Sequence, residues 1–179
     1  MKVLPLNEFK SSPWTLLYRV RIAIWELTWK CLCSWTPKPF NPWRLFILKL
    51  FGAKIFGTPF VHQRALIEHP WNLCMHDRAC LGDRSHAYCL ANIEILEHAT
   101  VAQQAYLCTG THDFTLDRLP LITNPISIGA HAFIGARAFL LPGITIGERS
   151  IVGACSVVSR SVPTLTIVAG NPAKIIRSL

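Results

Sequence analysis

The feature that constrains this chain most is a repeat of six residues in its C-terminal part. From Ile128 the sequence reads IGAHAF, IGARAF, LLPGIT, IGERSI, VGACSV and VSRSVP, and an aliphatic residue opens every unit. Neither the 3.6-residue period of a helix nor the alternation of a simple strand produces this spacing. Hexapeptides with a branched first residue and a small second one are typical of a parallel β-helix, where each unit builds one flat face of a triangular prism. The sequence therefore predicts an all-β solenoid with coils of about 18 residues.

The same pattern extends upstream in weaker form. Apolar residues recur every six positions in three triples, at 55, 61 and 67, at 75, 81 and 87, and at 95, 101 and 107. The steps from one triple to the next exceed six by 2, 2 and 15 residues, always after the third face. These insertions should stack at one corner of the prism. We expect function there, because loops on a rigid solenoid carry the variable chemistry.

The longest insertion contains the candidate catalytic residue. It begins with the segment CTGTHDF at 108–114, so His112 lies where a loop over 113–127 leaves the coil. An imidazole titrates near neutral pH, and a rigid coil edge would hold it in place, so His112 suits the role of a general base.

The formal net charge of +8 is concentrated in the first 54 residues. Residues 1–54 hold nine Lys or Arg against two Glu, a net of +7, whereas residues 55–179 hold nine against eight. The first segment is also rich in Trp, Phe, Leu and Ile, which a purely phosphate-binding tail does not need. It is predicted either to touch an anionic membrane or to dock on the core of its own or a neighbouring subunit. The nearly neutral remainder argues against nucleic-acid binding.

Two helices are predicted in this segment 1–54, ahead of a solenoid domain over 55–179. The first covers 14–33, with Ser12 as its N-cap and Pro13 in its first turn. The second opens at Asn41-Pro42 and ends at Gly52, after a proline-rich linker. Four charged residues interrupt the first helix, so we expect no membrane span, and no apolar run leads to a signal-peptide cleavage site.

The cysteines and histidines give no metal-binding signature. Seven cysteines, an odd number in a chain large enough to fold without disulfides, predict free thiols and a reducing, cytoplasmic compartment. Neither Cys31 with Cys33, nor Cys74 with His76 and Cys80, has the spacing of a structural zinc site. We therefore expect no metal.

Three segments together resemble a known family. The hexapeptide run, TGTHDF at 109–114 and the ending VAGNPAKIIR at 168–177 are similar to the left-handed β-helix acyltransferases. Within them the chain resembles the maltose/galactoside O-acetyltransferase branch, and most closely the colanic-acid-type exopolysaccharide acetyltransferases, through FILKLFGAKI, PWNL and QAYLCTGTHDF. The resemblance covers nearly the whole chain. It implies a left-handed β-helix, a homotrimer and acetyl-CoA as co-substrate. The implied acceptor is a sugar, sugar nucleotide or lipid-linked saccharide, which would place the protein in the cytoplasm or peripherally at the inner membrane face.

The resemblance also implies roles for individual residues. The histidine matching His112 would deprotonate an acceptor hydroxyl that attacks the thioester directly, while the backbone N–H of Ala136 faces the oxyanion. Asp113 is a candidate for orienting the imidazole, and Cys89 or Asn92 for contacting the acceptor, although the branch carries asparagine where this chain has Cys89. The positions that match acetyl-CoA contacts are Gly135, Ala136, Gly153, Ala154, Ser159, Arg160, Lys174 and Arg177.

Two alternatives remain open at this point. One is a non-catalytic β-helix scaffold, against which His112 and its long loop argue. The other is a metal-dependent hydratase on the same fold, which needs three histidines converging between subunits, whereas His76 and His112 fall on different faces by the count above. The acceptor and the acyl chain length depend on the geometry of the loop over 113–127 and on a neighbouring subunit.

Overall fold

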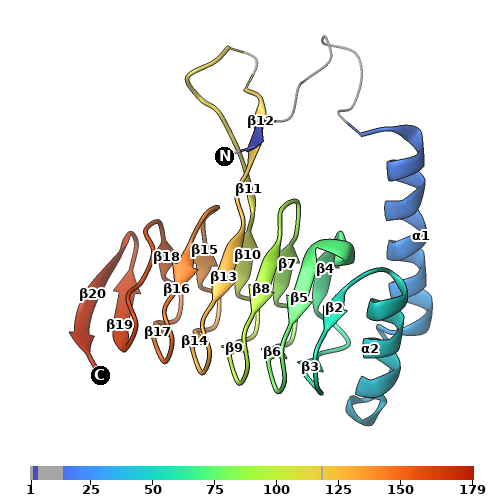
Figure 1. The fold of residues 1–179 in the computed structure, drawn as a ribbon, viewed down its shortest axis with the longest axis horizontal. Coiled ribbons are helices and arrows are strands. Elements are labelled where there is room, and N and C mark those ends of the chain that lie inside the picture. Colours follow the sequence, from blue (N-terminus) through green and yellow to red (C-terminus); the bar gives the residue numbers. More distant parts are fainter. Residues whose placement is uncertain (1, 4–13, 118) are drawn as a thin grey trace.

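The structure is a computed structural model that describes residues 2–3, 14–117 and 119–179. It is a parallel β-solenoid with two helices at its N-terminal end and a hairpin standing out from one edge (Figure 1). The first face holds β2 (Lys54–Ile55), β5 (Leu73–Met75), β8 (Ile93–Ile95), β13 (Ile126–Ile128) and β16 (Thr145–Ile146). The second holds β3 (Phe60–Val61), β6 (Cys80–Leu81), β9 (Thr100–Val101), β14 (Phe133–Ile134), β17 (Ile151–Val152) and β19 (Thr166–Gly170). The third holds β4 (Leu66–Glu68), β7 (His86–Tyr88), β10 (Tyr106–Cys108), β15 (Phe139–Leu140) and β18 (Val157–Val158).

The register of these strands confirms the predicted repeat. Every predicted inward position, from Ile55 to Val158, is at most 9% exposed. On the first face Ile95 pairs with Met75 on one side and Ile128 on the other, so the insertions do not disturb the stacking. The last strand, β20 (Ala173–Ser178), folds back antiparallel on β19. A single column of apolar side chains therefore fills the solenoid from one end to the other.

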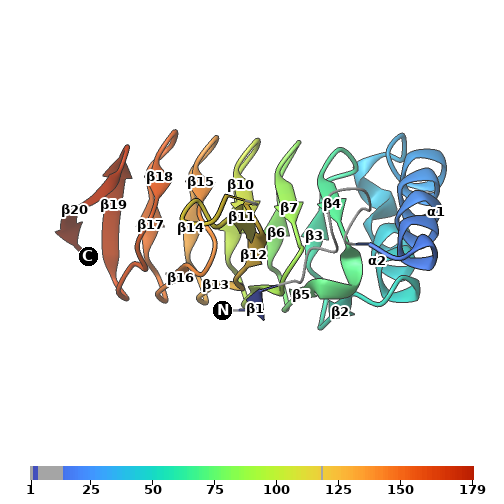
Figure 2. The same ribbon diagram turned by 90° about the horizontal axis from the view of Figure 1, so that it is seen from above.

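The two predicted helices cap the N-terminal end of that column. Helix α1 (Leu16–Leu32) and helix α2 (Asn41–Leu50) lie side by side across the first coil, as both ribbon views show (Figures 1 and 2). The N-cap of α1 is Thr15, whose Oγ1 accepts a hydrogen bond from the Tyr18 N–H at 3.3 Å. The predicted cap, Ser12 with Pro13, lies outside the described residues. A short 3-10 turn, η1 (Lys38–Phe40), ends the linker between the helices.

Two tryptophans of α1 pack and hydrogen-bond against the first coil. Trp25 and Trp29 are both buried, and their indole N–H groups donate to the backbone oxygens of Ile67 at 2.7 Å and of Ala65 at 3.2 Å. Both acceptors belong to the third face or the turn before it. The inner side of α1 thus adds its own apolar residues to the column of the solenoid.

Arg44, one of the charges counted in the basic N-terminal segment, is a buried structural residue. Its side chain is fully buried in α2, and burial lowers its pKa. Nε donates to the Val61 carbonyl at 2.9 Å, and Nη1 donates to Thr36 Oγ1 at 2.8 Å and to the Pro37 carbonyl at 3.0 Å. A fourth bond runs from Nη2 to the Lys38 carbonyl at 3.1 Å. The guanidinium thereby ties α2, the linker and the first coil together.

Replacing Arg44 with Met should destabilise the protein because several buried acceptors lose their donor at once. Each buried polar group left unsatisfied costs about 1–3 kcal/mol, so we expect a loss of about 3 kcal/mol or more in the free energy of unfolding. Urea denaturation followed by circular dichroism measures it. The control is Lys49→Met on the exposed side of the same helix, which should leave the midpoint nearly unchanged. Equal midpoints for the two variants would show that the hydrogen bonds of Arg44 do not stabilise the packing of α2 on the first coil.

Candidate active site

The longest insertion forms a hairpin that rises from one corner of the prism. Its strands β11 (Gly110–His112) and β12 (Leu121–Thr123) pair antiparallel, and β1 (Lys2–Val3) pairs with the outer side of β12. The hairpin leaves after the third face and returns to the first (Figures 1 and 2). The two shorter insertions lie at the same corner, one of them forming the 3-10 turn η2 (Pro70–Asn72). The predicted stacking of insertions at one corner is therefore confirmed.

His112 ends the ascending strand of this hairpin, with its side chain exposed to solvent. Its Nδ1 lies 2.6 Å from the carbonyl oxygen of Leu119, on the far side of the loop. A carbonyl oxygen can only accept, so the neutral ring carries its proton on Nδ1, and Nε2 is left with a lone pair. This tautomer is the one in which Nε2 can take a proton from a hydroxyl.

The hydrogen bonds of Asp113 do not reach the imidazole. Its Oδ1 accepts from the backbone N–H of Thr115 at 2.9 Å and from the Thr115 hydroxyl at 2.5 Å. These two bonds lower the pKa of the Asp113 carboxyl. Asp113 thus shapes the turn at the start of the loop, and the group bonded to the His112 ring is the Leu119 backbone carbonyl.

The residues expected at acetyl-CoA fall into two groups on different corners. Gly135 and Ala136 follow β14, and Gly153 and Ala154 follow β17, so these four lie between the second and third faces. Lys174 pairs with Ala169 of β19 close to this corner, and Arg177 lies further along β20. Ser159 and Arg160 instead follow β18, between the third and first faces, on the same side as the hairpin. Within one chain, the third face separates the His112 corner from the Ala136 corner.

Gly135 is required by coil stacking. A Cβ at this position would lie 2.6 Å from the Ala154 nitrogen and 2.6 Å from the Val152 oxygen, both of which belong to the next coil. At Gly153 the nearest neighbour would be the Ala169 Cβ, at 2.9 Å. The small residues at this corner therefore bring neighbouring coils into backbone contact, whatever ligand lies along the edge.

The two acceptor candidates differ in accessibility. Cys89 is fully buried, its thiol donates to the Ala87 carbonyl at 3.3 Å, and burial raises its pKa. Its side chain belongs to the apolar column, so nothing in this structure supports the predicted contact between Cys89 and the acceptor. Asn92 is exposed and helps to line a cavity of about 430 Å³ below the hairpin.

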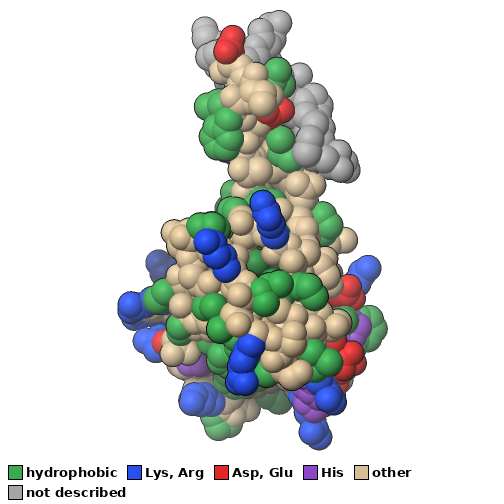
Figure 3. All heavy atoms as spheres, turned by 90° about the vertical axis from the view of Figure 1, so that its left-hand side faces the viewer, with side chains coloured by type: hydrophobic (Ala, Val, Ile, Leu, Met, Phe, Trp, Pro, Cys, Tyr) green, Lys and Arg blue, Asp and Glu red, His purple; other side chains and the backbone are tan. Residues whose placement is uncertain are grey.

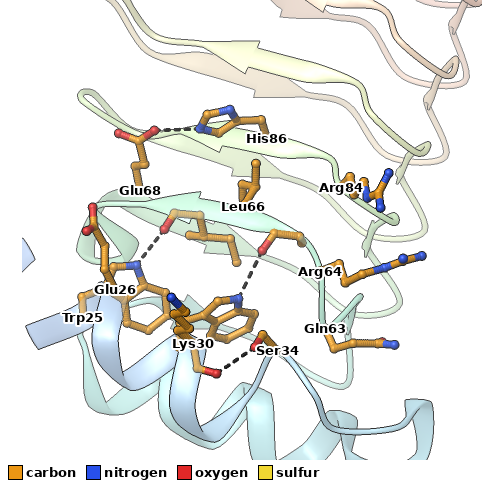
Figure 4. Close-up of a pocket in the computed structure, with 13 residues that line it drawn as sticks. Trp25, Glu26, Lys30, Ser34, Gln63, Arg64, Leu66, Glu68, Arg84 and His86 are labelled. Carbon is orange, nitrogen blue, oxygen red and sulfur yellow. Dashed lines mark hydrogen bonds and ion pairs between the residues drawn. The ribbon is translucent and has the colours of Figure 1, made fainter. Parts of the chain in front are cut away.

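Sequence reasoning missed two further asparagines of this cavity. Asn72 and Asn124 line it together with Asn92, and the Asn72 side-chain amide donates to the Cys89 carbonyl at 2.9 Å. The available signal was the spacing of twenty residues between Asn72 and Asn92, which equals one coil with its insertion. A larger cavity of about 670 Å³ lies between α1 and the third face, around Trp25, Leu66 and the His86–Glu68 pair (Figure 4). It belongs to the first coils, away from the hairpin.

The chain matches known proteins over most of its length. The family model of the bacterial transferase hexapeptide (six repeats) matches residues 125–160. The putative colanic acid biosynthesis acetyltransferase WcaF of Escherichia coli (strain K12) is 36% identical over 158 residues, which cover 88% of this chain and 87% of that protein. The solenoid fold and its six-residue repeat thus belong to a known class, the hexapeptide-repeat transferases. By its sequence the chain belongs to the hexapeptide-repeat acyltransferase family.

Solved structures agree with the fold. A hexapeptide-repeat acetyltransferase of Vibrio cholerae, solved in complex with acetyl-CoA, matches with a TM-score of 0.84 and 23% identity over 94% of this chain and 92% of that chain. A maltose O-acetyltransferase of Clostridium difficile matches with a TM-score of 0.79 and 23% identity over 92% and 89%. The predicted left-handed parallel β-helix with an N-terminal helical segment is confirmed. Over the described residues, no helix is both long and apolar enough to cross a bilayer.

Substitution of Gly135 by Ala should lower the thermal stability of the folded protein, whether or not acetyl-CoA is bound. The added methyl group would meet two backbone atoms of the next coil, and overpacking of this kind costs about 1–3 kcal/mol. We expect a lower midpoint of thermal unfolding for Gly135→Ala and a smaller decrease for the matched variant Gly153→Ala, which meets a side-chain methyl. An unchanged midpoint together with lost acetyl-CoA binding would instead make Gly135 a ligand-contacting residue.

Proposed function

We propose that this protein is an acetyl-CoA-dependent O-acetyltransferase that acts on a saccharide or saccharide precursor of a cell-surface glycan or exopolysaccharide. The observation that carries the proposal is the hydrogen bond from His112 Nδ1 to the Leu119 carbonyl, which leaves Nε2 of this exposed side chain available as a base. The name of the E. coli relative supports a glycan acceptor. A galactoside acetyltransferase solved with coenzyme A, with a TM-score of 0.70 and 18% identity over 89% of this chain and 81% of that chain, supports the donor.

The proposed mechanism is direct transfer. Nε2 of His112 takes the proton of an acceptor hydroxyl as the oxygen attacks the thioester carbonyl. The Ala136 backbone N–H donates to the oxyanion that develops, an interaction worth about 2.7–4 kcal/mol where a fixed donor has been removed from such sites. Collapse of the tetrahedral intermediate breaks the carbon–sulfur bond, and the imidazolium returns its proton to the leaving thiolate. The products are the acetyl ester and free coenzyme A.

The division of the site residues between two corners favours a homotrimer. His112, Ser159 and Arg160 lie at the corner between the third and first faces, and Ala136 and Ala154 lie at the corner between the second and third. A cyclic assembly joins two different surface patches of successive subunits. Such a ring brings the first corner of one chain against the second corner of its neighbour, so that each active site would be complete only between two chains.

Exposed basic residues at the C-terminal end of the solenoid support the proposal that the phosphates of acetyl-CoA bind there. Arg160, Lys174 and Arg177 are all exposed there. In the view of that end, basic side chains are spread over the face, and acidic ones gather along one flank and on the hairpin (Figure 3). Arginine and lysine form strong charge-assisted hydrogen bonds to phosphate oxygens.

Removal of the base should abolish turnover and spare donor binding. We expect His112→Ala to lower kcat by about 10²–10⁴-fold, the range usual for a general base, while acetyl-CoA binds with unchanged affinity. Chromatographic detection of the acetylated product from a panel of saccharides measures the first quantity and calorimetry the second. The matched control is Asp113→Asn, which should remain active because the carboxylate bonds only to Thr115 among the interactions described.

Mixed trimers test where the site lies. Co-assembly of His112→Ala chains with chains impaired at the Ala136 corner should restore part of the activity, since some sites then combine two intact corners. Full activity of His112→Ala alone would overturn the assignment of the base. A correctly assembled protein that binds no acetyl-CoA would instead favour the scaffold alternative.

A second proposal concerns the outer helical face, which we define as Leu16, Leu17, Val20, Ile24 and Leu27 of α1 with Trp43, Phe46 and Leu50 of α2. All eight side chains are exposed, Leu17 by 83%. We propose that this face lies against an anionic membrane surface, because a broad apolar area beside exposed Lys30, Lys38 and Lys49 suits such an interface. The exposed charge is smaller than the count of +7 indicated, since Arg44 is buried. Arg21 stays exposed, with its guanidinium carbon 3.8 Å from the centroid of the Trp71 ring.

Polar substitutions on the outer helical face should weaken membrane binding. Each fully buried leucine contributes about 1.5–3 kcal/mol, so Leu17→Gln combined with Leu27→Gln should lower partitioning onto phosphatidylserine-containing vesicles at least tenfold in co-sedimentation. The control is Leu165→Gln at the opposite end of the solenoid, where the leucine is also exposed. Unchanged sedimentation of the double variant would contradict the proposal. Dissociation of the oligomer in that variant would identify the face as a subunit contact.

A further inference from the structure

Three potential metal ligands meet on the outer side of the first face. Cys74 lies in β5, His76 follows the end of the same strand, and Glu94 is the direct partner of Cys74 in β8. One ligand atom from each side chain lies within 4.8 Å of the other two. Their sequence positions conceal the cluster, because Glu94 is a full coil away from Cys74.

The separations within this cluster match those around a tetrahedral cation. Cys74 Sγ lies 3.6 Å from His76 Nε2 and 3.9 Å from Glu94 Oε1, and Nε2 lies 3.1 Å from Oε1. A tetrahedral zinc ion with ordinary bond lengths holds sulfur and nitrogen about 3.6 Å apart, sulfur and oxygen about 3.5 Å, and nitrogen and oxygen about 3.3 Å. A cation can therefore be accommodated with shifts of a few tenths of an ångström.

We propose that Cys74, His76 and Glu94 form a binding site for Zn²⁺ or a similar thiophilic divalent cation, with the fourth coordination position open to water. On binding, the Cys74 thiol loses its proton to solvent, so the thiolate and the Glu94 carboxylate together balance the charge of the ion. The three ligands belong to the first face, and the cavity beside Cys74 and Glu94 shares Asn72 and Asn92 with the cavity below the hairpin. The proposed acetyl transfer uses none of the three ligands.

The surroundings of the cluster favour binding over a chance surface grouping. The His76 ring stacks on Phe56 with centroids 5.0 Å apart, which limits its rotation. Cys74 and Glu94 line a cavity of about 260 Å³, and that cavity supplies room for the open position. Lys54, the partner of Cys74 in β2, also lines the cavity, but its ammonium is carried on a flexible stem that can turn toward solvent. Donors of sulfur, nitrogen and oxygen type are the set that zinc accepts.

Cobalt(II) provides a direct test on the full chain, reduced and free of any affinity tag. Titration should produce a near-ultraviolet sulfur-to-cobalt charge-transfer band that saturates at one ion per chain and disappears when Zn²⁺ is added. Cys74→Ser should abolish the band, and Glu94→Gln should weaken cobalt binding at least tenfold. The matched control is Cys80→Ser, which alters a half-buried thiol of the same coil and should leave the titration unchanged.

Two results would overturn the proposal: no charge-transfer band in the unaltered protein, or a band that persists in Cys74→Ser. Because Glu94 is a half-exposed side chain, Glu94→Gln should fold normally, and circular dichroism with size-exclusion chromatography verifies this for each variant. The readout is independent of transferase activity, so failure of the metal site would leave the proposed function untouched.

Discussion

The stacking of one coil on the next is the constraint on which the rest of this structure depends. Strands of two or three residues have no stability of their own. They persist because each coil pairs its strands with those of the next coil and packs its buried side chains against them. Side chains such as Ile95 and Ile128 lie directly above one another in a single column, and small residues such as Gly135 let backbones meet where a Cβ would collide. Helix α1 closes the column at one end through Trp25 and Trp29.

Because of this stacking, the insertions that carry the candidate site residues lie at the corners of the prism. The flat faces are held in register by their ladders, so extra residues can be accommodated only where the chain turns. The hairpin with His112 uses that freedom at one corner, and the polar cavity around Asn72, Asn92 and Asn124 lies beneath it. Ala136 and Ala154 occupy the opposite edge of the third face from His112, whereas Ser159 and Arg160 share the hairpin corner, and the proposed ring rests on this division.

Composition was a less reliable guide than spacing. The basic, aromatic N-terminal segment was predicted either to touch a membrane or to dock on a core, and its net charge did not show that Arg44 is buried with Nε donating to the Val61 carbonyl. Counting charges does not show which of them remain in contact with solvent. The sequence showed that the first helix is rich in apolar residues, but only the packing of Trp25 and Trp29 shows which of its sides faces the solenoid.

The sequence by itself determined the β-helix, because a six-residue period records locally which side chains face inward. It also located the three insertions and placed His112 at the mouth of the longest one. The tertiary structure decided what those residues meet: the Leu119 carbonyl at the imidazole, the buried position of Cys89, and Glu94 beside Cys74. Such contacts join residues several positions apart across a loop or a whole coil apart, so they depend on the path of the backbone and the stacking of coils, which no local pattern encodes.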